Sequence, residues 1–474
     1  MEPFIYTFKT PNNYYFYDVN KDEIVAVNEG IYLFLQKKRN AFDLSEKEKN
    51  MIESLFSNGY LSDNRVRTLC HPNTEDVEFE VNNRACELVL QVTQMCNLCC
   101  SYCAYADSEH SVYQRKHSNK SMSWETARKS IDDFLDNSFE NTDVHFGFYG
   151  GEPFAEFPLV KKCVEYIEEN FVGKRIHFTA TTNGTLLNDE VISFIVAHNI
   201  HVMFSIDGPA SIHDASRKRL DGSGSFAAAF SSLRRLVEAY GERYKDFVSI
   251  HMVINPANDV DEADELFKDD FMKSHDIPAR ISIASDSKRD QPFKKCTDFD
   301  MKIKYRSFQA MASHFKMIDI PDISRIDNSL MEGRLKIDWR FKINKPPLED
   351  KTVPGGPCVP GKRKVFVDIH GDYFPCERVS ENLESMKIGS VSEGVNTKQC
   401  RNLLNFSQKT ENMCRNCFAF RYCGVCIAHV NYDDFSYESK KRECDAARKS
   451  FANILRYEAL EQEYNNLYRK ELNK

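Results

Sequence analysis

The chain has 474 residues, of which 42% are hydrophobic and 28% charged, and its formal net charge is −8. This length exceeds that of one ordinary core and predicts two or three domains, while the mildly acidic charge excludes a general attraction to nucleic acid or anionic membranes. No apolar run approaches the roughly 20 residues that a membrane helix needs, and the first residues lack the pattern of a signal peptide. We therefore expect a cytoplasmic protein with no nucleic acid and no membrane as partner.

The first 75 residues are predicted to form a small unit of three strands followed by helices. The strand candidates are short and rich in aromatic and β-branched residues: FIYTFKT, YYFYDV and EIVAVN. Two helical patterns follow, EGIYLFLQKK and SEKEKNMIESLFSNGYL, the second with Ser45 as its N-cap and an end near Gly59. This order predicts a winged-helix-like domain over 1–75, followed by a polar joint, HPNTEDVEFEVNN.

Residues 86–300 repeat a strand followed by a helix. The strand candidates are ELVLQV, VHFGFYGG, IHFTATTNG, HVMFSIDG, FVSIHMVIN and RISIAS, with amphipathic stretches such as SFAAAFSSLRRLVEAY between them. Six such units predict an α/β fold with a parallel sheet, curved or closed, and helices outside. Ligands gather at the carboxyl ends of such strands, where this sequence has cysteines after the first strand, GGEP after the second, TNGT after the third and DGP after the fourth.

The remaining chain is expected to fall into three parts. Residues 301–349 are charged and weakly patterned and are predicted to bridge two domains. Residues 350–448 are rich in cysteine and show little periodicity, as expected where metal replaces a large core. Residues 449–474 are predicted to form a closing amphipathic helix.

Most of the 16 cysteines lie in two clusters, at 96–103 and 358–444. Cytosolic thiols are kept reduced, so dense and regularly spaced cysteines predict metal binding rather than disulfides. Three others, Cys70, Cys86 and Cys163, fit scattered buried thiols.

The first cluster contains Cys96, Cys100 and Cys103, spaced C-x3-C-x2-C. Three thiolates on such a segment can hold three corners of a [4Fe–4S] cluster and leave the fourth iron open. A structural zinc site would need a fourth protein ligand. A small zinc loop is the alternative to the iron–sulfur interpretation.

The stretch CNLCCSYC resembles the signature loop of radical S-adenosylmethionine (SAM) enzymes, whose open iron chelates SAM. The resemblance implies a partial (β/α)6 TIM-like barrel, with Cys96, Cys100 and Cys103 as ligands and Cys99 as the spare cysteine. Tyr102 would lie at the family's aromatic position, near the adenine.

Two further segments resemble the SAM-binding elements of that family. GGEP implies that Gly150 and Gly151 allow a close backbone approach and that Glu152 accepts hydrogen bonds from the methionine ammonium. SIDGP implies Ser205 and Asp207 as ribose contacts. The remaining expected contact is a partner for the SAM carboxylate, for which the candidates are Arg217 and, nearly as good, Arg219.

The second cluster begins with C-x12-G-x4-C and continues with C-x2-C-x5-C-x2-C and a final cysteine. It resembles the SPASM domain, the auxiliary-cluster module of many radical SAM peptide modifiers, but has two residues where the family usually has three, Gly424 and Val425. The resemblance implies two auxiliary [4Fe–4S] clusters, three in all. The ligands would be Cys414, Cys417, Cys423 and Cys444 for one, and Cys358, Cys376 and Cys426 for the other.

The second auxiliary cluster would have an open iron unless Cys400 or Cys296 fills it, and an open iron could bind a substrate cysteine. The alternative is a zinc ribbon built on the two C-x2-C pairs.

The N-terminal unit resembles, by pattern alone, the element that binds leader peptides of ribosomally made precursors by adding the leader as a strand. Together the three regions resemble thioether-forming maturases of the sactipeptide and ranthipeptide types. This implies that a 5′-deoxyadenosyl radical abstracts hydrogen from a cysteine-containing precursor peptide, bound through its leader, and that a cysteine sulfur then bonds the carbon. The expected electron donor is a flavodoxin or ferredoxin.

Two other functions stay open. A sulfatase maturase that forms formylglycine, or a maturase that joins two carbons, would share the barrel and the SPASM domain. Sulfatase maturases carry an Asp base just after the second auxiliary cysteine, where this chain has Glu377, which is either a base or an ion-pair residue. A zinc-dependent winged-helix regulator of DNA is the alternative outside enzymes.

Overall fold

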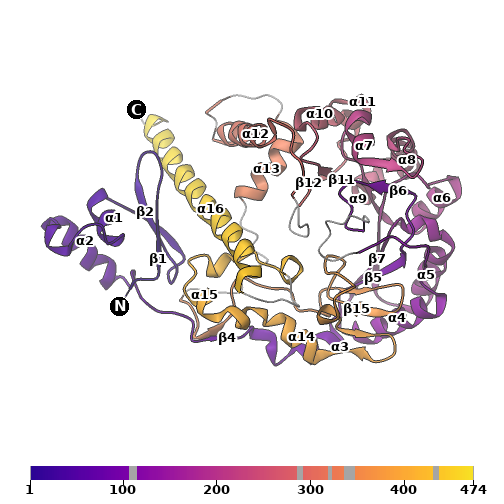
Figure 1. Ribbon diagram of the computed structural model, residues 1–474, viewed down its shortest axis with the longest axis horizontal. Helices are drawn as coiled ribbons and strands as arrows, with labels where there is room; N and C mark the ends of the chain where they lie inside the picture. The colour runs from indigo at the N-terminus through magenta and orange to yellow at the C-terminus, as the bar shows by residue number, and fades with distance from the viewer. Residues whose placement is uncertain are drawn as a thin grey trace. The chain divides into compact units, whose positions relative to one another are not determined.

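The computed structural model divides into two compact units and is shown in Figure 1. It describes residues 2–105, 115–285, 292–315, 317–318, 323–335, 347–430 and 437–472. The unit that we call the terminal unit comprises Met1–Glu75, Glu332–Cys358 and Leu404–Lys474. The other, the barrel unit, comprises Asp76–Met331 and Val359–Leu403. The predicted cysteine-rich region 350–448 is therefore divided between the two units.

The terminal unit contains the predicted three strands as an antiparallel sheet in the order β1-β2-β3. The strands are β1 (Ile5–Lys9), β2 (Tyr14–Asp18) and β3 (Glu23–Val27), followed by α1 (Glu29–Leu35) and α2 (Glu46–Ser57). One face of the sheet packs Phe16 and Val27 against Ile31, Ile52 and Leu55 of these helices. Helix α2 begins at a complete capping box, because Ser45 accepts from the Glu48 amide and Glu48 in turn accepts from the Ser45 amide.

A long C-terminal helix covers another group of side chains from the same sheet. This helix, α16 (Tyr437–Leu472), begins before the predicted residue 449 and therefore includes Cys444. Its Phe451 and Leu455 share a core with Phe8 and Tyr17. The remaining elements of the unit are β4 (Thr68–Leu69) paired with β13 (Lys351–Thr352), and α15 (Glu411–Arg415).

The barrel unit confirms the predicted fold, a partial TIM-like barrel. Its six predicted strands form parallel pairs in the order β12-β11-β9-β8-β7-β5, the reverse of their order in the chain. Beyond β5 the sheet continues with parallel β14 and then antiparallel β15, β16 and β17. The first six are β5 (Glu87–Thr93), β7 (Asp143–Gly150), β8 (Arg175–Thr182), β9 (His201–Ser205), β11 (Val248–Ile254) and β12 (Ala279–Ile283); the added strands are β14 (Val365–Val367), β15 (Asp372–Phe374), β16 (Gly389–Ser390) and β17 (Gly394–Val395).

Helices cover the outside of this curved sheet (Figure 1). In α8, for example, Ala229, Leu233, Leu236 and Val237 recur at helical spacing and are all buried. The helices of the unit are α3 (Val77–Asn83), α4 (Trp124–Asn137), α5 (Phe157–Asn170), α6 (Asp189–Ala197), α7 (Ala210–Ser216), α8 (Phe226–Tyr240), α9 (Tyr244–Phe247), α10 (Val260–Asp264), α11 (Asp270–His275), α12 (Phe299–His314), α13 (Arg325–Leu335, which runs into the terminal unit) and α14 (Thr397–Leu404).

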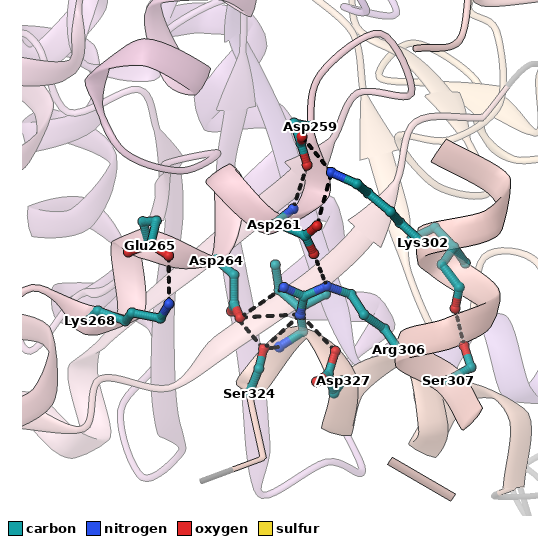
Figure 2. A network of polar contacts seen from close by, with 12 residues as sticks. Asp259, Asp261, Asp264, Glu265, Lys268, Lys302, Arg306, Ser307, Ser324 and Asp327 are labelled. Atoms are coloured by element: carbon teal, nitrogen blue, oxygen red, sulfur yellow. Dashed lines mark hydrogen bonds and ion pairs between the residues drawn. The ribbon is translucent and has the colours of Figure 1, made fainter. Parts of the chain in front are cut away.

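Two segments differ from their expected character. The stretch expected to be a polar joint contains α3, because Val77 and Val81 lie one turn apart and are both buried. The weakly patterned stretch 301–349 contains most of α12, which buries Phe299 and Ile303 and also forms ion pairs. Figure 2 shows Arg306 of α12 between carboxylates, 2.8 Å from both Asp261 and Asp327.

Within the part of the chain that the structure describes, no helix is both long and apolar enough to cross a membrane.

Removal of the α2 cap should loosen that helix locally. We expect Ser45→Ala to lower the free energy of opening of the first turn of α2 by about 0.5–2 kcal/mol, because a helix amide loses its acceptor. Hydrogen exchange of the α2 amides measures this. Ser57→Ala in the same helix lies outside the cap and should leave the exchange of the first turn unchanged; equal effects of the two substitutions would contradict the role of the cap.

Candidate functional site

The first cysteine cluster follows the carboxyl end of β5 and is ordered by a short strand. This strand, β6 (Leu98–Cys100), pairs antiparallel with β10 (Arg217–Arg219), with Cys100 opposite Arg217. Side chains alternate along a strand, so Cys99 is exposed, and its thiol donates to the carbonyls of Lys218 and Arg219 at 3.6 and 3.5 Å. The segment is thus not a simple loop, and Cys99 lies on the opposite face from Cys100.

Each of the other three sulfurs accepts a hydrogen bond. The Leu98 amide donates to Cys96 at 3.5 Å and the Tyr105 amide donates to Cys103 at 3.4 Å. Arg217 Nη1 donates to Cys100 at 3.9 Å. Donors of this kind stabilise thiolates that ligate iron.

Burial favours the protonated thiol at Cys96 and Cys100. It raises the pKa of Cys96 to about 12 and that of Cys100 to about 11. Burial also raises the pKa of Cys103, but His117, whose Nε2 lies 3.6 Å from its sulfur, outweighs this and lowers the pKa. Buried thiolates need a compensating cation, which iron supplies, and the three hydrogen-bonded sulfurs on one short segment therefore fit an iron–sulfur cluster.

The two glycines after β7 allow a close approach of backbone to backbone, and the expected approach to a ligand stays a prediction. A Cβ on Gly150 (φ +146°) would lie 2.1 Å from the Thr93 carbonyl oxygen, and one on Gly151 would lie 2.0 Å from that of Met95. The Gly151 amide donates to Thr93 and the Glu152 amide to Met95. The glycines therefore fix the segment that leads into Cys96.

Glu152 organises the neighbouring strand end. Its buried carboxylate accepts from Thr182 Oγ1 and from the Asn183 amide, both at 2.7 Å, and from the Phe154 amide at 3.2 Å. Burial raises its pKa to about 7. Since a carboxylate has about four acceptor positions, three protein donors leave it one for the expected ammonium.

Asp207 and Arg217 form a buried ion pair beside the cysteines. Arg217 Nε and Nη2 donate to the Asp207 carboxylate at 2.8 and 3.2 Å, and Asp207 also accepts from the Val253 amide at 3.0 Å and from the Tyr102 hydroxyl. The Arg217 guanidinium also lies over the Tyr102 ring, 5.3 Å from its centroid. The two expected SAM contacts therefore bind each other.

The other expected SAM-contact positions are also resolved. Arg219 Nε donates to the Gly224 carbonyl at 3.3 Å, whereas Arg217 pairs with Asp207. This distinguishes it from Arg217. Ser205 is buried at the end of β9, two residues before Asp207.

A buried ion pair that sequence reasoning missed links two parts of the barrel unit. Arg115 Nε lies 2.6 Å from the Glu381 carboxylate, and both side chains are almost fully buried. Arg115 also donates to the Tyr105 hydroxyl and, at 3.3 Å, to the Glu377 carbonyl. It thus joins the residues after Cys103 to those after Cys376. Nothing in the sequence around Arg115 distinguishes it from a surface arginine, because its burial arises only in the folded barrel.

Glu377, the candidate base, forms an ion pair. Its carboxylate lies 3.1 Å from Lys364 Nζ, which also contacts Glu87 at 3.0 Å. Glu87 is the first residue of β5, whereas the cysteines follow the opposite end of that strand. Burial raises the pKa of Glu377, but the Lys364 charge outweighs it and the pKa is lowered. The ion-pair interpretation therefore has direct structural support.

Four cysteines of the second cluster line one cavity in the terminal unit. Cys414, Cys417, Cys423 and Cys444 all contribute to the wall of this small cavity. Cys414 lies in α15 and Cys444 in α16, and the other two lie between these helices. This is the set that the SPASM resemblance assigns to one cluster, and four thiols around one cavity fit such a group.

The other expected ligands are divided between the units. Cys358 and Cys426 belong to the terminal unit and Cys376 to the barrel unit. Cys400 is fully buried beside Gly361, and Cys296 donates to the Asn258 carbonyl at 3.5 Å. Among the described residues, no three or more His, Cys, Asp or Glu side chains are gathered as around a single metal ion.

The close approach at Gly150 generates a prediction about iron binding. We expect reconstituted Gly150→Ala to bind less iron and sulfide than the unsubstituted protein, because the added Cβ displaces Thr93 and with it the backbone that leads into Cys96. Gly222→Ala is the matched control, since Gly222 also has a positive φ (+85°) but open space around it. A full iron load in Gly150→Ala would contradict this role of the glycine.

Residues 90–269 match the family model of the radical SAM superfamily. This range includes the cysteine segment, the two glycines with Glu152, and the Asp207–Arg217 pair.

Curated relatives extend the similarity over more of the chain. The chain is 36% identical to an uncharacterized protein of Methanocaldococcus jannaschii over 138 residues, which are 29% of this chain and 44% of that protein. It therefore spans less than half of that relative's length. It is 21% identical to the radical SAM cyclopropyl synthase TigE of Paramaledivibacter caminithermalis over 82% of this chain and 79% of that protein. It is 25% identical to a cysteine-type anaerobic sulfatase-maturating enzyme of Clostridium perfringens over 71% of this chain and 86% of that enzyme.

Among solved structures, the chain is similar to anSMEcpe with bound AdoMet and Cp18Cys peptide. The match has a TM-score of 0.57 at 20% identity and covers 81% of this chain and 99% of that one. At this identity the likeness shows the fold alone.

Proposed function

We propose that this chain, whose residues 90–269 form a radical SAM domain, is a peptide maturase that installs intramolecular thioether crosslinks in a ribosomally made precursor. The observation that carries the proposal is the presence of two separate sets of thiols. One is the hydrogen-bonded set after β5, and the other is the four-cysteine cavity of the terminal unit. A radical SAM enzyme that needs only SAM cleavage has no use for the second set, whereas bond formation to sulfur must dispose of an electron.

The residues of the barrel unit would hold a cluster and SAM and exclude water from both. When bound, a [4Fe–4S] cluster at Cys96, Cys100 and Cys103 supplies the electron that cleaves SAM homolytically. Glu152 and the Asp207–Arg217 pair would keep this segment in place through contacts within the protein itself. Such preorganisation is what positions a reactive carbon against its target.

The terminal unit would bind the leader of the precursor. Strand β3 (Glu23–Val27) forms one edge of the three-stranded sheet, and Glu23 and Ala26 are exposed on it. An extended peptide adds to such an edge through main-chain hydrogen bonds. A flavodoxin or ferredoxin would supply the electron for SAM cleavage, and three [4Fe–4S] clusters would be the full complement.

Formylglycine formation is the second candidate, because the chain covers 86% of a sulfatase-maturating enzyme. The pairing of Glu377 with Lys364 disfavours it, since a carboxylate with a lowered pKa is a weaker base.

Metal content and the fate of sulfur test the proposal. After anaerobic reconstitution we expect about twelve iron and twelve sulfide per chain. With SAM and a reductant, cysteine-containing candidate precursors should lose two hydrogens per link and one alkylatable thiol, with all sulfur retained. Loss of the sulfur from the peptide would instead indicate formylglycine. Zinc in place of iron would overturn the enzymatic proposal.

Glu377 offers an independent test of the two candidates. If the ion-pair interpretation is right, Glu377→Gln keeps thioether formation within a few-fold of the unchanged chain, because the reaction needs no base at this position. Lys364→Met removes the partner charge of Glu377 and should likewise keep thioether formation within a few-fold of the unchanged chain. A fall of 100-fold or more in Glu377→Gln alone, the size expected for loss of a general base, would contradict this and favour the sulfatase-maturase mechanism.

A further inference from the structure

A buried polar cluster joins the first cysteine segment to the segment that carries Cys376. Its four members are Gln91 of β5, Tyr105, Arg115 and Glu381, and none of their side chains is more than 7% exposed. All four belong to the barrel unit. Since buried polar groups are costly unless they bind one another, this cluster holds two distant stretches of the chain in a fixed relation.

The hydroxyl of Tyr105 accepts two hydrogen bonds within this cluster. One comes from Arg115 Nη2 and the other, at 3.0 Å, from Gln91 Nε2. The Arg115 guanidinium also lies 4.1 Å from the centroid of the Tyr105 ring. A tyrosine that is held at both its ring and its hydroxyl has few positions available, so its backbone is restricted as well.

The C-terminal segment of the barrel unit, residues 359–403, in turn holds the two donors. Glu381 Oε2 lies 2.6 Å from Arg115 Nε, and Glu381 Oε1 accepts from Gln91 Nε2 at 3.3 Å. The Glu377 carbonyl accepts from Arg115 Nη1 at 3.3 Å. The Ile369 amide donates to Gln91 Oε1, also at 3.3 Å. Three residues of this segment therefore determine where the donors to the tyrosine lie.

The backbone of Tyr105 contacts an expected iron ligand. Its amide donates to Cys103 Sγ at 3.4 Å, and its carbonyl accepts from the His117 amide at 3.2 Å. Hydrogen bonds to the sulfurs of an iron–sulfur cluster stabilise the more negative reduced form and so raise the reduction potential. Displacement of this amide would therefore change the potential of a cluster held by Cys103.

We propose that Arg115 and Glu381 are positioning residues for the cluster of the first cysteine segment, and that they act by holding the Tyr105 amide on the Cys103 sulfur. The C-terminal segment of the barrel unit thereby tunes the centre that cleaves SAM, although the ligands of that centre lie elsewhere in the chain. This rests on the part of the proposed function that places a cluster and SAM in the barrel unit, and it is independent of the reaction of the substrate.

The test is an EPR-monitored redox titration of the reconstituted full chain, in which the SAM-binding cluster is the one whose signal changes when SAM is added. Tyr105→Phe removes the hydroxyl, and the double variant Arg115→Met/Glu381→Gln removes both charges of the ion pair. Neither alters the net charge beside the cluster. Each should lower the midpoint potential of the SAM-binding cluster and leave the other midpoints unchanged, because the amide of residue 105 is less firmly held.

Two further variants of the barrel unit serve as matched controls. Tyr166→Phe removes a hydroxyl that donates to Asp132 at 2.6 Å, and Arg306→Met breaks an ion pair with Asp327. Neither of these contacts involves the cysteine segment, so both controls should keep the midpoint potentials of the unsubstituted chain. Iron and sulfide are counted in every variant.

Unchanged midpoints in Tyr105→Phe and in the double variant at full iron content would overturn the inference. Loss of iron from the SAM-binding cluster alone would support it, because Cys103 would then be displaced. Loss of iron from all clusters, or an equal fall of the midpoint in the controls, would overturn it by showing a general loss of structure. Absence of any signal that responds to SAM in the unsubstituted chain would instead refute the proposed function.

Discussion

The pairing of β5 on both of its edges is the constraint on which the rest of the barrel unit depends. On one side β5 pairs with β7, which ends in the two glycines that fix the lead into Cys96. On the other it pairs with β14, which belongs to the segment carrying Cys376 and Glu377. A strand in the middle of a parallel sheet cannot shift register without moving its whole buried set to the other face. The positions of the cysteine segment and of the 359–403 segment are therefore set by one strand.

The buried charged residues around the candidate site form ion pairs. Asp207 with Arg217 and Arg115 with Glu381 are each nearly inaccessible, and each also bonds a tyrosine next to the cysteines. Such pairs contribute little net stability compared with apolar packing, but they restrict the conformations available to the groups that they hold. The two pairs therefore help to fix the arrangement of the cysteine segment.

Much of this architecture was accessible from the sequence, because its signals are local. The six barrel strands are continuous apolar runs bounded by turns, and the predicted Ser45 cap is present with its partner Glu48. The ligand cysteines are recognisable by spacing. The features that the sequence did not show involve charged side chains that pair or become buried only in the folded chain. Helix α12 combines the ion pairs of Arg306 with a buried face that includes Phe299 and Ile303. Lys440 and Arg448 line the four-cysteine cavity only once α16 is folded. Glu152 and Asp207 also accept several hydrogen bonds from the protein, which the sequence did not show.

Helix α16 contributes both to the four-cysteine cavity and to the core beside the three-stranded sheet. Its first turns supply Cys444, Lys440 and Arg448 to the cavity, while Phe451, Leu455 and Glu463 farther along contact the sheet proposed to bind the leader. Binding energy gained when a metal group fills the cavity is also folding energy for this helix. Under the proposed function, cofactor assembly and the order of the sheet proposed to bind the leader are therefore thermodynamically linked, and loss of the proposed auxiliary metal should leave that sheet less ordered.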